Sequence, residues 1–117
     1  MTLAGLDWER IAVDLDAHGC AVLNAVLSRE ECAALAASYG DEEQFRSCVV
    51  MARHGFGRGE YKYFRYPLPQ VVAGLRAALY PRLAPVANRW NEAMGIDGRF
   101  PAEHLEFLER CHSAGQT

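Results

Sequence analysis

The stretch FRSCVVMARHGFGRGEYKYFRY, residues 45–66, decides the fold that this chain is expected to adopt. Its first ten residues include two adjacent valines, which favour a strand, and the glycine-rich GFGRG that follows is typical of a turn. In EYKYFRY, alternation places Tyr61 and Tyr63 on one face of a returning strand and Lys62 and Phe64 on the other. The stretch therefore predicts a hairpin or a strand–loop–strand unit.

The second part of this stretch, residues 53–66, combines five aromatic and four Lys or Arg residues with three glycines. Its GxGxG rhythm does not indicate a phosphate loop, because such a loop needs a following helix that points its amides at the anion. The order of basic, glycine and aromatic residues also departs from ribonucleoprotein motifs, so base stacking on Phe56, Tyr61 and Tyr63 is disfavoured. The wall of a substrate site and an ordinary basic hairpin both remain open interpretations.

The segments before this unit are mainly helical in pattern. Apolar residues at mixed helical spacings over residues 6–15 predict an amphipathic helix that ends at Gly19. The run CAVLNAVL, residues 20–27, is too short for a helix and predicts a buried strand. Residues 28–31, SREE, match a capping box that starts a second helix, and Asp41 is expected to cap one further turn.

The segments after the unit are also helical in pattern. Apolar spacing from Gln70 onward predicts a long helix, in which Pro81 and Pro85 favour a kink or a break near Tyr80. Pro101 is expected to start a last helix, since proline is favoured at the first helical position.

These elements together predict an α+β fold in one domain, residues 1–117, with helices predominating over a small sheet of about three strands. A chain of this length can bury one small core. A sheet with so few strands leaves exposed edges and little area on which the helices can pack. The chain is therefore expected to be incomplete as a fold.

The composition is that of a globular protein, with a formal net charge of −3 and a pI near 5.8. This charge disfavours nucleic acid as a partner of the whole surface, and five of the twelve Lys and Arg residues lie between Arg46 and Arg65. The local positive charge suits a small anionic ligand. With no signal peptide and no membrane-spanning apolar run in the sequence, we expect a reduced, cytoplasmic protein with no membrane partner.

The sequence predicts no metal site and no catalytic residue in this chain. The four cysteines and four histidines lack zinc-like spacing, and the cysteines, each in an apolar run, are expected to be buried. His104 and Glu106 have a His-x-acid order, but side chains two apart on a helix diverge by about 200°. His54, inside the basic and aromatic segment, is the one histidine that we consider a site candidate.

Four blocks carry a resemblance to a known family. They are HGCAVLNAVLSREECAALAASY, RHGFGRGEYKYFRYPLP, LYPRLAPVANRWNEAMGI and FPAEHLEFLERCHSAGQT. In this order they resemble the N-terminal half of a bacterial iron(II)/2-oxoglutarate-dependent oxygenase over nearly the whole chain. Cys20 departs from the pattern, because an aromatic residue is usual there.

The resemblance implies a double-stranded β-helix oxygenase for full-length relatives, with Fe(II) and 2-oxoglutarate as cofactors. The metal-binding His-x-Asp and distal His of that family would lie beyond this chain, which implies a shortened relative or a fragment that binds no cofactor itself. Segments ahead of the core commonly cover the barrel mouth in such oxygenases. The resemblance therefore makes Arg53, His54, Arg58, Tyr61 and Tyr63 candidates for lining the entrance of an unknown substrate.

A second hypothesis is a non-catalytic binding module that keeps the scaffold without the chemistry. In that case Arg53, Arg58, Lys62 and Arg65 would hold an anionic partner. A homodimer could then cover the open strand edges and apolar helix faces.

Overall fold

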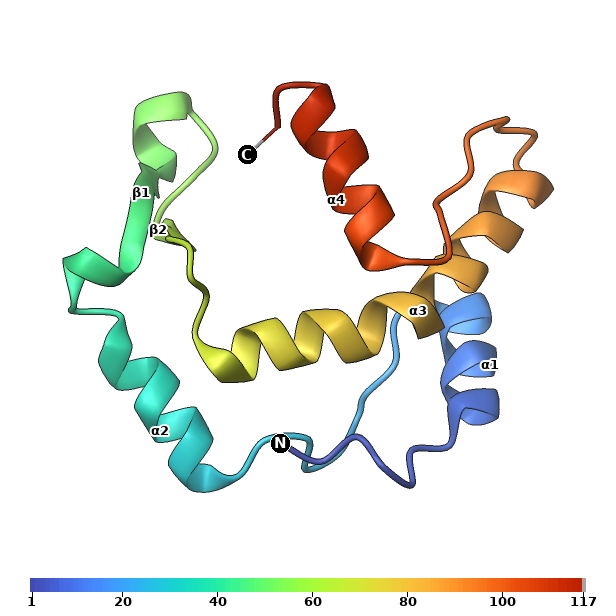
Figure 1. The fold of residues 1–117 in the computed structure, drawn as a ribbon, viewed down its shortest axis with the longest axis horizontal. Helices are drawn as coiled ribbons and strands as arrows, with labels where there is room; N and C mark the ends of the chain where they lie inside the picture. Colours follow the sequence, from blue (N-terminus) through green and yellow to red (C-terminus); the bar gives the residue numbers. More distant parts are fainter. Residues whose placement is uncertain (117) are drawn as a thin grey trace. The chain divides into compact units, whose positions relative to one another are not determined.

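The computed structural model describes residues 1–116, which divide into two compact units (Figure 1). The first unit contains Met1 and Leu27–Ala73, and it holds the predicted strand–loop–strand segment. The second contains Thr2–Val26 and the described chain from Gly74 onward. The prediction of a helix-rich α+β fold is confirmed, with four α-helices and one two-stranded antiparallel sheet in the described part of the chain.

The first unit starts with helix α2, Arg29–Ser38, at the predicted capping box. The Ser28 hydroxyl accepts from the Glu31 amide at 3.1 Å, and the Glu31 carboxylate accepts from the Ser28 amide at 3.0 Å. Asp41 then caps the single 3₁₀ turn Glu42–Gln44 through a 3.2 Å bond from the Glu43 amide, as predicted. This turn leads directly into the sheet.

The predicted strand–loop–strand unit is a hairpin of β1, Phe45–Val50, and β2, Glu60–Phe64. The strands pair antiparallel, with Ser47 opposite Tyr63 and Val49 opposite Tyr61. A 3₁₀ turn, Met51–His54, and a glycine-rich loop join them.

An irregularity in the pairing determines which side chains share a face of the hairpin. Phe45 pairs with Phe64 and Ser47 with Tyr63, so Arg46 is an extra residue in β1. Since alternation would otherwise put Phe45 with Ser47, this bulge moves Phe45 to the opposite face, beside Phe64 and Lys62.

The second unit begins with helix α1, Trp8–His18, which Asp7 caps through a 3.0 Å bond from the Arg10 amide. The helix ends at Gly19, as predicted, in the left-handed conformation with φ 73°. Arg89 and Trp90 donate to the Asp16 carboxylate near its end, at 2.9 and 2.7 Å.

The strand predicted over residues 20–27 was wrong, because this run is an irregular connection in the structure. Val22 is 69% exposed, and Ala25 adopts a positive φ of 54° that a strand does not allow. Its backbone bonds are isolated ones, such as that from the Thr2 amide to the Val26 carbonyl. The apolar composition of this run was misread, because a strand also needs a neighbour with which to pair.

Helix α3, Gln70–Ala93, continues through both prolines, so of the two predicted alternatives, a kink or a break near Tyr80, the break does not occur. Figure 1 shows its axis changing direction along its length, as expected of a proline-containing helix. Pro81 and Pro85 lie four residues apart and so on one side, where they line a shallow pocket together with Ile11 and Leu15 of α1.

Helix α4, His104–Ser113, begins three residues later than predicted from Pro101. Side chains of α3 hold the backbone before it: the Tyr80 hydroxyl donates to the Pro101 carbonyl at 2.7 Å, and the Asn88 side chain bonds both backbone groups of Phe100. Tyr80 then stacks on Phe107 of α4, with ring centres 5.6 Å apart.

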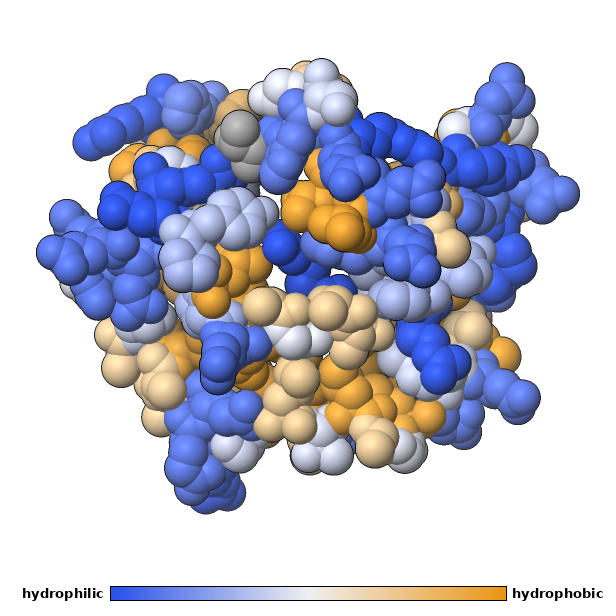
Figure 2. Space-filling view, viewed as in Figure 1, coloured by the Kyte–Doolittle hydropathy of each residue, from blue (hydrophilic) through white to orange (hydrophobic). Residues whose placement is uncertain are grey.

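Few hydrophobic side chains are deeply buried in the described residues. These are Ile11, Phe45, Ala84 and Val86. Figure 2 accordingly shows hydrophobic residues in orange lying open among hydrophilic ones on the face viewed. The expectation that all cysteines are buried was wrong, because Cys20, Cys32 and Cys48 are exposed. No described helix is long and apolar enough to cross a membrane.

Candidate functional site

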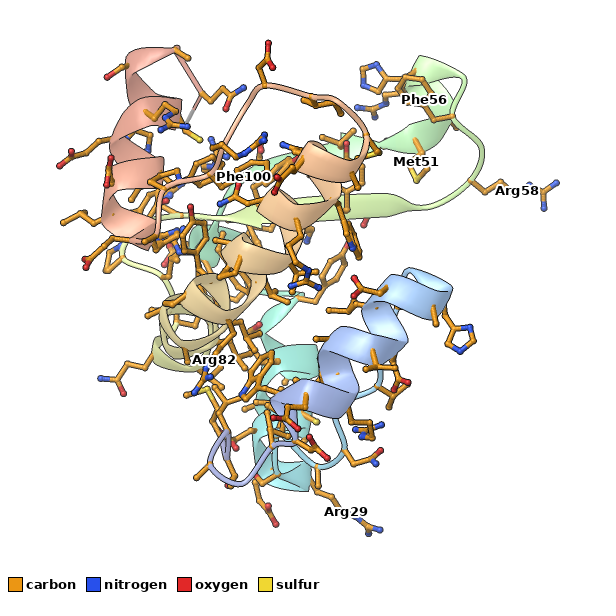
Figure 3. All side chains as sticks on the ribbon, turned by 90° about the vertical axis from the view of Figure 1, so that its right-hand side faces the viewer. Arg29, Met51, Phe56, Arg58, Arg82 and Phe100 are labelled. Carbon is orange, nitrogen blue, oxygen red and sulfur yellow. The ribbon has the colours of Figure 1, made fainter. Side chains whose placement is uncertain are left out.

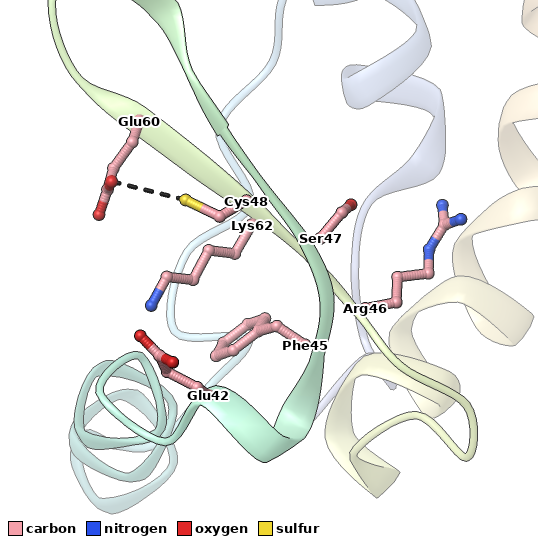
Figure 4. A pocket seen from close by; sticks show the side chains of 7 residues that line it. All are labelled: Glu42, Phe45, Arg46, Ser47, Cys48, Glu60 and Lys62. Atoms are coloured by element: carbon pink, nitrogen blue, oxygen red, sulfur yellow. Dashed lines mark hydrogen bonds between the residues drawn. The ribbon is translucent and has the colours of Figure 1, made fainter.

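The hairpin of the first unit presents two chemically different faces, and all the sequence-predicted site residues lie on it or in its loop. We define the aromatic face as Arg46, Ser47, Val49, Tyr61 and Tyr63. We define the polar face as Phe45, Cys48, Glu60, Lys62 and Phe64. Figure 4 shows Arg46 and Ser47 pointing away from the side on which Cys48, Glu60 and Lys62 lie.

The aromatic face brings together the two tyrosines that the sequence predicted on one side of β2. Their rings lie edge to face, with centres 5.6 Å apart, and are 44% and 46% exposed. The Arg46 guanidinium lies 5.0 Å from the centre of the Tyr63 ring, within cation–π range. This face therefore offers aromatic surface next to a positive charge.

Four residues of the polar face, Phe45, Cys48, Glu60 and Lys62, line an open pocket of about 280 Å³ together with Glu42, Arg46 and Ser47 (Figure 4). The Lys62 ammonium lies 4.1 Å from the Tyr39 ring centre and 5.1 Å from that of Phe45. It also donates to the Tyr39 carbonyl at 2.8 Å. These contacts tie β2 to the end of α2, so Lys62 is held by the protein itself rather than presented to a ligand.

Glu60 connects the other polar groups of this face. Its carboxylate accepts from the Tyr39 hydroxyl at 3.0 Å and from the Cys48 thiol at 3.5 Å. Partial desolvation, the hydrogen bond to Glu60 and its negative charge raise the pKa of both Tyr39 and Cys48. The Cys48 thiol is therefore kept protonated, which makes it a poor nucleophile.

The other predicted site residues lie in the connection between the strands. Arg53 and His54 belong to the 3₁₀ turn, which ends at Gly55 in the left-handed conformation with φ 71°. The His54 ring stacks on Phe56 with centres 5.9 Å apart, and Phe56 is 71% exposed. Figure 3 shows Phe56 and Arg58 at the loop, with Arg58 extending away from the ribbon.

The structure thus brings Tyr61 and Tyr63 together and places Arg53, His54 and Arg58 at the end of the same hairpin. It also identifies two residues that the sequence reasoning missed, Arg46 and Cys48. Alternation in β1 could have suggested Cys48, but the position of Arg46 depends on the bulge, which no sequence pattern indicates.

The family resemblance implies an iron site, which needs several His or carboxylate ligands close together. Within residues 1–116, no three His, Cys, Asp or Glu side chains are grouped so that they could bind a metal ion. His104 lies against Tyr80, with ring centres 5.3 Å apart, and both desolvation and the charge of Arg76 lower its pKa. The described residues do not supply an iron centre, so we assign no catalytic step to them.

Comparison with known proteins gives a family for this chain. Residues 59–117 match the model of a family, Oxygenase-NA, described as an oxygenase catalysing oxidative methylation of damaged DNA. Two uncharacterised proteins of Mycobacterium tuberculosis, MT2286 of strain CDC 1551 and Rv2227 of strain H37Rv, are each 41% identical over 54 residues. The match covers 46% of this chain but 23% of each relative. No solved structure matches the chain.

Proposed function

Since this chain belongs to the oxygenase family described as catalysing oxidative methylation of damaged DNA, we propose that it forms the scaffold and substrate entrance of such an enzyme. The coarse function is therefore oxygenase-related. The enzyme that we propose is iron(II)- and 2-oxoglutarate-dependent, bacterial and cytoplasmic, and acts on damaged DNA. This substrate departs from our sequence-based expectation, in which the net charge of −3 disfavoured nucleic acid.

One observation carries the proposal: the family match begins at Gly59, at the start of β2, and so includes Tyr61 and Tyr63. These exposed rings and the loop cations Arg53 and Arg58 lie on the same hairpin. Positive charge supplies most of the affinity of proteins for a phosphate backbone. A local basic hairpin on an acidic protein can therefore contact DNA even though the net charge is negative.

The proposal assigns the substrate entrance, rather than the metal centre, to this chain. When bound by such an enzyme, iron and 2-oxoglutarate would supply the oxidising chemistry. The residues of this chain would hold and orient the substrate next to that centre.

Reversing the charge of the loop tests the proposed entrance. We expect the variant Arg53→Glu/Arg58→Glu to bind a fluorescent oligonucleotide carrying methylated bases about tenfold more weakly at low salt, because phosphate contacts are lost. Arg29→Glu, which changes charge at the exposed start of α2, is the matched control and should bind more nearly like the wild type. Equal oligonucleotide binding by the wild type, the double variant and the control would contradict the assignment of Arg53 and Arg58 to a substrate entrance.

An anaerobic titration with Fe(II) and 2-oxoglutarate tests whether the residues of this chain form a metal centre themselves. We expect this chain to develop no charge-transfer absorption, since it lacks a suitable group of metal ligands among its described residues. An absorption band that disappears in His54→Ala or His104→Ala would contradict the proposal.

The alternative is a binding module that forms a homodimer. Two observations favour a homodimer. The sheet has only two strands in the described chain, and large hydrophobic side chains such as Val22 and Leu105 are exposed elsewhere. Light scattering distinguishes the two functions. A monomer that binds DNA supports the substrate entrance of an oxygenase. A dimer that does not bind DNA supports the non-catalytic binding module.

A further inference from the structure

The aromatic face has the features of a base-stacking surface, and this inference rests on the DNA substrate proposed above. Tyr61 and Tyr63 each leave nearly half of their surface exposed, on neighbouring positions of the same strand face. Their edge-to-face contact at 5.6 Å limits how far either ring can move. Rings held in this way can receive an apolar ligand without losing much further conformational freedom.

The charges of the hairpin are divided between its two faces. From Phe45 to Phe64 the sequence contains four Lys or Arg residues and a single acidic residue, Glu60. Glu60 belongs to the polar face, where it bonds Tyr39 and Cys48. The aromatic face carries Arg46 instead. A phosphate group bound on this face would therefore lie near a cation, while Glu60, the acidic residue of the hairpin, lies on the other face.

The surroundings of Tyr61 favour its uncharged form. Partial desolvation and the neighbouring Tyr63 hydroxyl raise the pKa of Tyr61 above its ordinary value of 10.0. A phenol that stays protonated does not repel an anion, and its hydroxyl can donate a hydrogen bond.

The loop between the strands also combines aromatic and basic residues. His54 and Phe56 form a second aromatic pair, and Arg53 and Arg58 flank them in the sequence. Aromatic rings interleaved with cations are the arrangement that proteins use for unpaired bases, since every base has a face that can stack while the cations track the phosphates.

We infer that the aromatic face binds single-stranded nucleic acid, with unpaired bases stacking on Tyr61 and Tyr63 and Arg46 contacting the phosphate backbone. Bases in a duplex are already stacked on one another, so their faces cannot reach these rings. The hairpin therefore selects the unpaired strand over the duplex.

The test compares binding of a fluorescent 12-residue oligothymidine, its duplex with oligoadenine, and polyglutamate. The wild type is expected to bind the single strand at least about tenfold more tightly than the duplex. Tyr61→Ala and Tyr63→Ala should each weaken single-strand binding by about fivefold or more, as loss of a stacking ring does elsewhere. Tyr61→Phe and Tyr63→Phe, which keep the ring, should bind within about twofold of wild type.

Circular dichroism of each variant checks that it is folded. If an alanine variant is unfolded, the phenylalanine variants still test the role of the tyrosines. Single-strand binding that is retained by both alanine variants, or lost equally in the phenylalanine variants, would overturn stacking while leaving DNA as the substrate. Binding of polyglutamate as tight as that of oligothymidine would overturn nucleic-acid recognition in favour of an acidic protein partner. A protein that binds neither form of DNA would overturn both this inference and the proposed substrate.

Discussion

The two faces of the hairpin use similar residues for different purposes. On the polar face, the cation Lys62 lies against the rings of Tyr39 and Phe45 and donates to a backbone carbonyl. On the aromatic face, the cation Arg46 lies over one ring, Tyr63, and both tyrosines remain open to solvent. The same aromatic and basic residue types therefore serve two purposes: on the polar face they tie β2 to the end of α2, and on the aromatic face they leave two tyrosine rings accessible.

Removing the buried ring of the polar face should have the largest effect on stability. Phe45 is only 8% exposed and contacts Phe64 and Tyr39, with ring centres 4.8 and 6.0 Å away. We expect Phe45→Ala to lower the free energy of unfolding by about 3 kcal/mol or more, measured by urea denaturation. With so small a core, this loss could unfold the first unit completely. A change below about 1 kcal/mol would show that the polar face does not hold the hairpin to α2.

Neutralising the cation of the polar face, Lys62, should have a smaller effect on stability. Lys62→Met keeps the aliphatic stem but removes the cation–π contacts and the bond to the Tyr39 carbonyl. We expect a loss of about 1 kcal/mol in the free energy of unfolding. Arg58→Met, at the exposed loop, is the matched control and should leave the unfolding midpoint nearly unchanged. If the two variants are equally stable, Lys62 is not a structural cation.

The reactivity of Cys48 should depend on pH through Glu60, its neighbour on the polar face. Because its pKa is raised by desolvation and by Glu60, less thiolate is present at a given pH, so alkylation should reach its half-maximal rate at a higher pH than for an ordinary thiol. Glu60→Gln removes the negative charge, so the rate profile of Cys48 should shift to lower pH. Mass spectrometry of the labelled peptide measures this rate separately from that of the exposed Cys20 and Cys32. A profile unmoved by Glu60→Gln would contradict the coupling of thiol and carboxylate.

The sequence was sufficient for features that depend on local chemistry. The capping box at Ser28, the cap at Asp41, the end of α1 at Gly19 and the alternation of Tyr61 and Tyr63 were all predicted correctly. Each of these depends on residues within one turn or one strand, where side-chain type limits the backbone directly.

The features that were missed depend on contacts distant in sequence. The run of residues 20–27 has the composition of a strand but no partner strand, and the start of α4 is delayed because Tyr80 and Asn88 hold the residues before it. In the candidate site, the alternation along β2 was predictable, but the bulge that places Phe45 beside Lys62 and Arg46 over Tyr63 was not. Register and bulges are set by pairing between strands, which a single sequence does not reveal.

The division between a binding face and a structural face can be tested by one NMR titration of the protein with oligothymidine, followed on the aromatic ring protons of its tyrosines. Bases that stack on Tyr61 and Tyr63 should shift the ring signals of both upfield, while those of Tyr39, whose ring contacts Lys62 of the polar face, should stay nearly constant. Shifts of equal size at all three tyrosines, or at Tyr39 alone, would contradict the assignment of binding to the aromatic face.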